Sequence, residues 1–231
     1  MSRTVVYLPG MGGNVGISPA LAQLDLDVVI PAVPGFTGES GFEAPTDYLG
    51  WLVATWDAID ASGAIDDGPV PVIGASVGGM LAAELAALRP EVVSKLALLA
   101  PFGIADVDQL GFDYFSLRGP DRLPHLFAKG VPEMFEQRFL DRGEDEAPVA
   151  SYIVDIATAA LTWPIGDRGT AKRLHRIRCP RLVLMGGQDE LVPPELAEAW
   201  GGATVIDGAG HLLEWDCPDQ VAVELGRFLP S

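Results

Sequence analysis

The sequence predicts an α/β fold with a mostly parallel sheet, and three observations support this prediction. Apolar runs rich in β-branched residues alternate with helical patterns through the first hundred residues. These runs are continuously apolar, which is typical of strands that are covered by helices on both faces. Glycine-rich loops follow several of the runs, as expected where a strand gives way to a crossover. In such folds ligands bind at the carboxyl ends of the strands, so a functional site is expected in the loops that follow them.

The first half of the predicted core contains four strands and three helices. Strands are expected over residues 4–8, 28–32, 70–74 and 95–100. Helices are expected after the pair Ser18-Pro19, over residues 46–61 and over residues 80–88. In the second of these helices the apolar residues fall at helical spacing and should face the core: Leu49, Leu52, Val53, Trp56 and Ile59. Trp51 and Trp56 are therefore interpreted as packing residues.

The pattern changes between residues 104 and 171, where no strand is evident and bulky side chains are frequent. Helices are expected there over 131–140 and 147–163, which together indicate a small helical insertion. Strands resume over 181–185 and 203–206, and a last helix covers 218–229. We therefore expect a core formed by residues 1–103 and 172–231, with residues 104–171 folded over the edge of its sheet as a helical cap.

Composition narrows the classes of function. The 231 residues, 48% of them apolar, suffice for one sizeable core, and the formal charge of −17 argues against nucleic acid or an anionic membrane as a partner. Cys179 and Cys217 have no metal-type spacing and are expected to be reduced. A dinucleotide fingerprint fails because Val15 replaces its third glycine and no acidic residue closes the second strand, so no cofactor is expected. No metal is expected either, since the cysteines form no metal-spaced cluster. Neither a signal peptide nor a membrane span is evident, which predicts a cytoplasmic protein.

A sharp turn between strand and helix is predicted at Gly74-Ala75-Ser76-Val77-Gly78. Such a turn strains the backbone of its middle residue and brings neighbouring chain close, so the positions two before and two after should lack a Cβ. Gly74 and Gly78 meet this requirement. The hydroxyl of Ser76 would then stand clear of the sheet, which suits a nucleophile. The alternative is a tight packing turn without chemistry.

Ser76, Asp189 and His211 each follow a different predicted strand, so their side chains should meet at one edge of the sheet. A serine hydroxyl needs an imidazole to take its proton, and a carboxylate must orient that imidazole. The chain order of serine, aspartate and histidine is the order used on this architecture. Glu190 and Asp207 remain rival carboxylates. The other two histidines, His125 and His175, are poorly placed for this role.

An acyl-transfer site also needs hydrogen-bond donors for the oxyanion that develops on the substrate. The backbone N–H of Val77, directly after the proposed nucleophile, is expected to supply one donor. The second is expected from the glycine-rich loop after the first strand, at the N–H of Met11. The alternative is that the glycines of this loop only turn the chain.

Five motifs together resemble the α/β-hydrolase-fold family, and specifically its compact esterase-like members with a helical cap. They are the oxyanion loop at 8–13, a proline-glycine loop at 34–40, the elbow at 74–79, the acid strand and loop at 179–193, and the histidine loop at 208–212. Pro9 departs from the histidine that often precedes the first glycine, and Ala32 stands in place of a leading aspartate. The first strand corresponds to the third strand of the family, so the resemblance implies about six strands.

The resemblance and the three loops imply a serine hydrolase that cleaves a small, largely apolar ester, thioester or lactone through an acyl-Ser76 intermediate. The same triad in related enzymes cleaves carbon–carbon bonds of diketone-like substrates, and some members only bind ligands; both remain alternatives. The charged stretch over 138–146 is interpreted as solvated, so the inner face of the cap is expected to be apolar. A small-molecule substrate is the one partner expected, and the sequence leaves the oligomeric state open.

Overall fold

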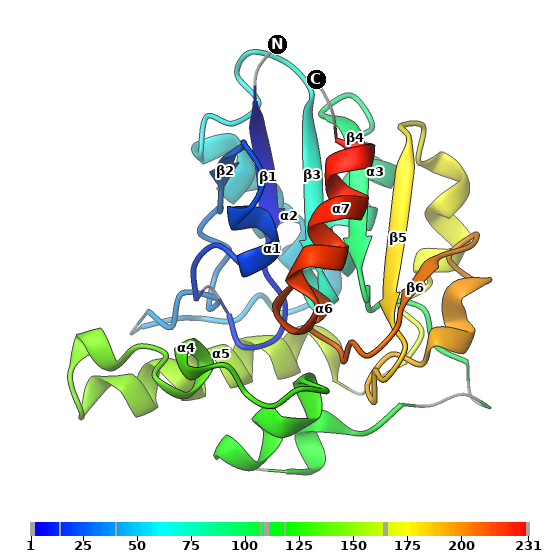
Figure 1. Cartoon of the computed structure of the whole chain (residues 1–231). Coiled ribbons are helices and arrows are strands. Elements are labelled where there is room, and N and C mark those ends of the chain that lie inside the picture. The colour runs from blue at the N-terminus through cyan, green and yellow to red at the C-terminus, as the bar shows by residue number, and fades with distance from the viewer. Residues whose placement is uncertain are drawn as a thin grey trace.

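A single parallel sheet organises the chain (Figure 1). The computed structural model describes residues 3–13, 15–39, 41–106, 108, 111–117, 119–163 and 166–229. Within these residues the sheet has six strands in the order β2-β1-β3-β4-β5-β6, and every neighbouring pair is parallel. The strands are β1 (Thr4–Leu8), β2 (Asp27–Val29), β3 (Val70–Ala75), β4 (Val93–Leu99), β5 (Arg181–Gly186) and β6 (Thr204–Ile206). The predicted α/β fold with six strands is confirmed.

The register of the sheet brings the ends of its strands together. Gly74 of β3 pairs with Leu8, the last residue of β1, while the last residues of β3 and β4 pair with each other. On the other side, Gly186 of β5 pairs with Ile206 of β6. Because parallel strands end at the same edge, the loops after β1, β3, β5 and β6 all leave the sheet at one edge.

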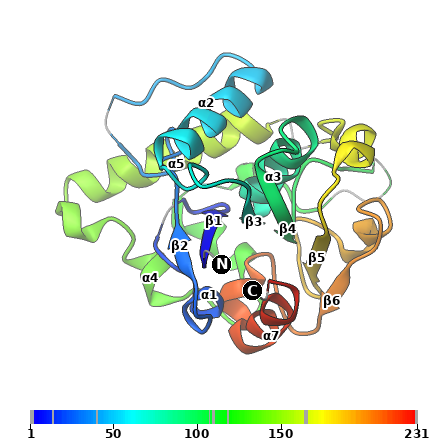
Figure 2. The same cartoon turned by 90° about the horizontal axis from the view of Figure 1, so that it is seen from above.

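Helices cover both faces of the sheet, as its continuously apolar strands require (Figure 2). One face carries α1 (Pro19–Ala22), α6 (Leu213–Asp216) and α7 (Pro218–Phe228), and the other carries α2 (Tyr48–Ala61) and α3 (Ser76–Leu88). The buried apolar residues accordingly divide into two large clusters, one on each side of the sheet. Ser18 caps α1 and Asp47 caps α2, each by accepting a hydrogen bond from a backbone N–H of the first turn.

The inward face of α2 differs from the prediction at two positions. Leu49 and Val53 are 60% and 41% exposed, whereas Trp51 is only 1% exposed. The buried residues of this helix are Trp51, Leu52, Thr55 and Ile59. The face that contacts the core is therefore rotated about the helix axis relative to the predicted face, which included Leu49 and Val53. Trp51 and Trp56 do pack against the core, as expected.

The described chain between β4 and β5, here called the helical segment, forms helices joined by loops and contains no strand. Its part up to Thr162 lies beyond the carboxyl edge of the sheet (Figure 1), whereas its last helix packs against α3. The helical segment holds η1 (Tyr114–Ser116), η2 (Gly119–Leu126), α4 (Glu133–Glu136), η3 (Leu140–Arg142), α5 (Glu146–Thr162) and η4 (Thr170–Arg176). The helix predicted over 131–140 is reduced to the single turn α4, because Phe139 adopts a left-handed conformation with φ of 65° that interrupts the helix. The division into core and cap stays a prediction.

Helix α5 packs directly on two of the core loops. A Cβ on Gly13 would meet the Val154 side chain, and a Cβ on Gly35 would meet Ala157 at 2.5 Å. Both glycines have positive φ, so the turn and the close approach each require glycine here. The oxyanion loop and the proline-glycine loop are thereby held against the helical segment; Ser40, the last residue of the latter motif, lies outside the described residues.

Candidate active site

The turn between β3 and α3 has the strained geometry that its sequence predicts. Ser76 has φ of 55°, a rare conformation for a residue with a side chain. A Cβ on Gly74 would collide with the backbone of Gly78 and Gly79, and a Cβ on Gly78 would collide with the carbonyl of Leu8. The turn therefore tolerates no side chain at either glycine. It places Ser76 at the first position of a 13-residue helix, at the carboxyl edge of the sheet.

Ser76, His211 and Asp189 lie in one line of hydrogen bonds. The Nε2 of His211 is 2.7 Å from the Oγ of Ser76, and its Nδ1 is 2.9 Å from the Oδ2 of Asp189. An ionised carboxylate can only accept, so Nδ1 carries the proton and Nε2 is free to accept from the serine hydroxyl. The side chains of Asp189 and His211 are fully buried, which strengthens their interaction. This arrangement suits removal of the serine proton by histidine.

Two further contacts fix the acid and the base. The Oδ1 of Asp189 accepts hydrogen bonds from the N–H groups of Leu191 at 2.8 Å and Val192 at 2.9 Å, which leaves Oδ2 for the histidine. The ring of Phe102 stands edge-on to the His211 ring, with 5.3 Å between their centroids. The sequence offered no signal for Phe102, because its role depends on Phe102 lying beside a loop more than a hundred residues away.

The rival residues lie elsewhere. Glu190 pairs with His125, whose Nδ1 is 2.7 Å from Oε2 of the glutamate, and the side chain of Asp207 is exposed. His175 lies beside Pro90 and Arg178 in a surface cavity away from the triad. Among the three carboxylates considered from the sequence, Asp189 is the one that the structure brings to His211.

The glycine-rich loop after β1 lies against the proposed nucleophile. A Cβ on Gly10 would be 2.7 Å from the Cβ of Ser76, so the loop backbone and the serine are in direct contact. Met11 follows on this loop and is buried, and Val77 follows Ser76 in the first turn of α3. The N–H groups in the first turn of a helix have no partner within the helix, so that of Val77 is available to a ligand. Met11 and Val77 are thus the residues that directly follow the contacting pair Gly10 and Ser76, and their role as donors stays a prediction.

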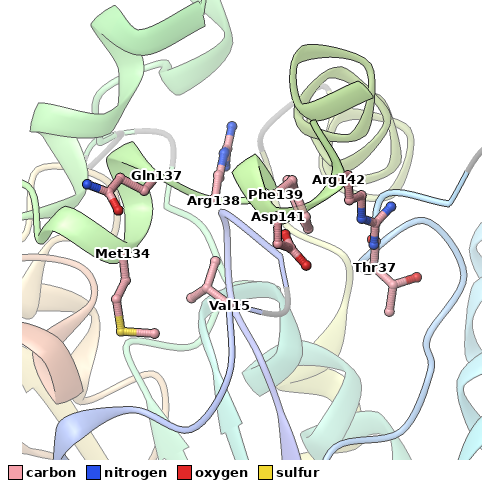
Figure 3. A pocket seen from close by; sticks show the side chains of 8 residues that line it. All are labelled: Val15, Thr37, Met134, Gln137, Arg138, Phe139, Asp141 and Arg142. Carbon is pink, nitrogen blue, oxygen red and sulfur yellow. The ribbon is translucent and has the colours of Figure 1, made fainter. Parts of the chain in front are cut away.

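A cavity of about 450 Å³ opens between the helical segment and the core loops (Figure 3). Met134, Gln137 and Arg142 reach it from the helical segment, while Val15 and Thr37 reach it from the core loops. A second cavity, of about 930 Å³, lies within the helical segment and has a mixed lining: Arg122, Leu123, Phe135, Glu136, Arg138, Leu140, Glu144, Ala147, Pro148, Ser151, Tyr152 and Asp155. Neither lining includes Ser76, Asp189 or His211.

The expectation that the charged stretch over 138–146 is wholly solvated is wrong at Arg138. Its side chain is only 9% exposed and its Nη2 lies 3.6 Å from Asp155, which also pairs with Arg122 at 3.0 Å. Burial raises the pKa of the Asp155 carboxyl, and the two guanidinium groups act against that rise. Arg138 borders both cavities, so their lining is not purely apolar. A residue that is distant in sequence supplies its partner, which is why the stretch appeared solvated.

Sequence reasoning also missed two buried carboxylates that follow His211. Glu214 is fully buried and accepts a hydrogen bond from the hydroxyl of Tyr7 at 3.1 Å; Asp216 is 7% exposed. Burial raises the pKa of Glu214 to about 7, while hydrogen bonds from its backbone and Tyr7 act in the opposite direction. A signal was present, since two acids interrupt an otherwise apolar stretch from Leu212 to Cys217, and buried acids need partners.

Neither a group of metal-ligating residues nor a membrane-spanning helix occurs among the described residues. In that part of the chain no three histidine, cysteine or acidic residues are grouped so that they could hold a metal ion. No helix formed by those residues is both long enough and apolar enough to cross a bilayer.

Comparison with known proteins places this geometry in context. The pimeloyl-[acyl-carrier protein] methyl ester esterase of Neisseria meningitidis serogroup B / serotype 15 (strain H44/76) is 25% identical over 189 residues, which cover 74% of this chain and 72% of the relative. The poly(3-hydroxyalkanoate) depolymerase of Ectopseudomonas oleovorans is 31% identical over 193 residues, which cover 80% of this chain and 67% of the relative. Two relatives named for the ester or polyester they act on thus share most of their length with the chain.

A solved structure of a hydrolase has a similar fold. The 2-hydroxy-6-oxo-6-phenylhexa-2,4-dienoate hydrolase from Rhodococcus sp. strain RHA1 superposes with a TM-score of 0.72 at 20% identity, over 98% of this chain and 90% of that one. The sequence profile described as "Alpha/beta hydrolase family" matches residues 5–225, nearly the whole chain. The chain therefore belongs to the alpha/beta hydrolase family and is a hydrolase.

Proposed function

We propose that this hydrolase cleaves a small, largely apolar ester, or a related thioester or lactone, through an acyl-Ser76 intermediate. The observation that supports the proposal most strongly is the continuous line of hydrogen bonds from Ser76 Oγ through His211 to Asp189. The chain's relatives include an esterase and a polyester depolymerase, which agrees with cleavage of an ester bond.

The proposed reaction has two halves with the same base. The Nε2 of His211 takes the hydroxyl proton of Ser76 while Oγ attacks the carbonyl carbon, and the carbonyl oxygen becomes an oxyanion that the N–H groups of Met11 and Val77 stabilise. The tetrahedral intermediate collapses, His211 returns the proton to the leaving alcohol, and the acyl group stays on Oγ. Water, deprotonated by His211, then attacks the acyl carbon, and the acid leaves as Oγ recovers its proton. Asp189 holds the imidazolium in place throughout.

The acyl chain of the substrate should be short and mainly apolar. Several aliphatic or aromatic side chains line the larger cavity, among them Leu123, Phe135, Leu140 and Ala147. An apolar pocket gains about 0.8 kcal/mol for each methylene that it buries, which corresponds to about a three- to fourfold gain in kcat/KM. We therefore expect p-nitrophenyl esters to improve from acetate to about butyrate or hexanoate and then to decline. A flat series would contradict an apolar acyl pocket.

The test combines a covalent probe with matched substrates. A fluorophosphonate should label the protein once, on the peptide that contains Ser76, and p-nitrophenyl butyrate should be hydrolysed. Ser76→Ala should abolish both signals, whereas Ser18→Ala, a change at a buried serine that caps α1, should keep them. Labelling that persists in Ser76→Ala would refute the nucleophile. Cleavage of a 2-hydroxy-6-oxo-dienoate, the class of compound in the structural neighbour's name, in preference to every ester would instead favour the alternative of carbon–carbon hydrolysis.

A further inference from the structure

A short strip of the helical segment, residues 125–129, runs along the two loops that carry Asp189 and His211. His125 pairs with Glu190, the residue after Asp189, at 2.7 Å. The carbonyl of Leu126 accepts a hydrogen bond at 3.0 Å from the N–H of Leu212, the residue after His211. The strip thus contacts the immediate neighbours of both the acid and the base.

Asp216 joins this strip to the histidine loop through one carboxylate. Its Oδ2 accepts a hydrogen bond of 2.7 Å from the N–H of Gly210, the residue before His211, and another of 2.7 Å from the N–H of Ala128 in the strip. Its Oδ1 accepts a third, at 3.3 Å, from the N–H of Lys129. Three backbone donors from two segments that are more than eighty residues apart therefore converge on one side chain.

The contact is close as well as polar. A Cβ on Gly210 would lie 2.7 Å from the N of Ala128 and 2.9 Å from the Oδ2 of Asp216. Glycine is thus required for the loop and the strip to approach this closely, although the backbone of Gly210 does not adopt a positive φ.

Burial decides which of these contacts contributes most. The side chains of His125 and Glu190 are 29% and 58% exposed, so their ion pair is worth little in water. Asp216 is 7% exposed, and hydrogen bonds from backbone N–H groups to a buried carboxylate are about twice as strong as neutral ones. Asp216 is therefore the main link between the strip and the loop.

We propose that Asp216 is a positioning residue, which holds the strip 125–129 against the histidine loop and thereby fixes His211 between Asp189 and Ser76. The inference rests on the proposed function, because it assigns the geometry of the same triad to a residue outside it. A base displaced by about 1 Å can lose roughly 10²-fold in rate. Asp216 lines neither of the two cavities, so the effect should fall on kcat rather than on KM.

The experiment compares Asp216→Ala with a matched control, Asp219→Ala. Asp219 lies three residues further on, at the start of α7, and accepts a hydrogen bond from Gln23, the residue after α1, instead of contacting the histidine loop. With p-nitrophenyl butyrate, Asp216→Ala should lower kcat by roughly 10²-fold with KM changed by less than about threefold, while Asp219→Ala should match the wild type. Asp216→Asn keeps one oxygen for Gly210 and Ala128, so it should restore kcat to within about tenfold of the wild type.

A spectroscopic reading separates positioning from a general loss of structure. The proton between His211 Nδ1 and Asp189 should give a resolved downfield ¹H NMR signal in the wild type and in Asp219→Ala. In Asp216→Ala the signal should broaden or disappear while the cooperative unfolding transition remains. If Asp216→Ala keeps both the signal and kcat, or loses kcat only in proportion to its folded fraction, the proposal is overturned.

A second variant covers the case in which Asp216→Ala does not fold. Gly210→Ala keeps the Asp216 side chain but places a methyl group 2.7 Å from the N of Ala128 and 2.9 Å from Oδ2 of Asp216, so it forces the loop and the strip apart by a different change. It should lower kcat and weaken the downfield signal in the same way, and a Gly210→Ala variant with wild-type kcat and signal would overturn the proposal. Failure of the proposed function would give a different result. The wild-type protein would then hydrolyse no ester and would not be labelled by the phosphonate, whether or not the downfield NMR signal is present.

Discussion

The elbow at Ser76 and the histidine loop leave the same edge of one sheet, but they are held in place in different ways. The elbow is fixed by its own glycines, which meet the first turn of α3 and the end of the neighbouring strand β1. The histidine loop depends on partners that are distant in the chain, such as Asp189 and the N–H of Ala128. A motif of five residues is therefore enough to predict the elbow from the sequence. The contacts that hold the histidine loop exist only once distant parts of the chain have come together.

The largest expected effect comes from removing the proposed nucleophile of the elbow, the region whose shape its own residues determine. Ser76→Ala should lower kcat by roughly 10⁴-fold or more, and the residual rate should come from binding and the oxyanion donors. Stability should barely change, because the glycines and not the serine side chain shape the turn. Steady-state hydrolysis and thermal unfolding measure the two quantities. Loss of the fold in this variant would show that the serine hydroxyl also supports the elbow.

The next effect tests whether the loop residues act as a unit. Replacing both Asp189 and His211 should cost little more in kcat than replacing His211 alone, since the aspartate acts only through the histidine. The comparison requires Asp189→Asn, His211→Ala and the double variant, each assayed with the same aryl ester. If the two losses multiply, Asp189 has a function independent of His211.

Breaking the elbow itself should act on stability. Gly78→Ala places a methyl group against the carbonyls of Leu8 and Pro9, and neither backbone group can move without shifting β1. We expect a loss of about 3 kcal/mol or more in the free energy of unfolding, measured by denaturant titration. Gly226→Ala is a suitable control, because its Cβ would meet only the Leu24 side chain at 3.5 Å. Equal stability of the two variants would contradict the steric account of the turn.

The smallest effect concerns the buried carboxyl that follows the histidine loop. Because its pKa rises from 4.5 to about 7 on folding, Glu214 keeps a proton in the folded protein that the unfolded chain releases. The stabilisation is complete below about pH 4.5 and is lost as pH rises through about 7, a change of at most about 3 kcal/mol. Glu214→Gln should therefore exceed the wild type in stability at pH 8 and resemble it at pH 5. Urea midpoints at both pH values test this, and a gain that is independent of pH would contradict it.

The features that the sequence predicted correctly depend on local chemistry. The strands are continuous apolar runs, so six of them could be located, and the glycines around Ser76 have one steric purpose. Asp189 and His211 could be selected because parallel strands deliver their loops to one edge. For Asp189 and His211, the chain order and the fold class were enough to select the residues before any contact between them was known.

The features that escaped prediction depend on contacts between distant segments. The contact face of α2 could not be predicted, because helical spacing admits both Leu49 and Trp51 and only packing against α3 chooses between them. Arg138 was expected in solvent because its partner, Asp155, lies 17 residues further on, in α5. Glu214 and Asp216 follow His211 closely, but their partners, Tyr7 and Ala128, are on β1 and in the helical segment.

Ser76 and His211 both have no exposed surface, although neither is a hydrophobic residue. A reagent can reach Ser76 only while the residues that cover it are displaced. The rate of labelling therefore depends on how often this displacement occurs. Phosphonate labelling should consequently reach a plateau as the probe concentration rises, and a plateau that is equal for phosphonates of different intrinsic reactivity would identify opening as the limiting step. The same barrier lies between the acyl-enzyme and bulk solvent, so the water that hydrolyses the intermediate must pass it as well.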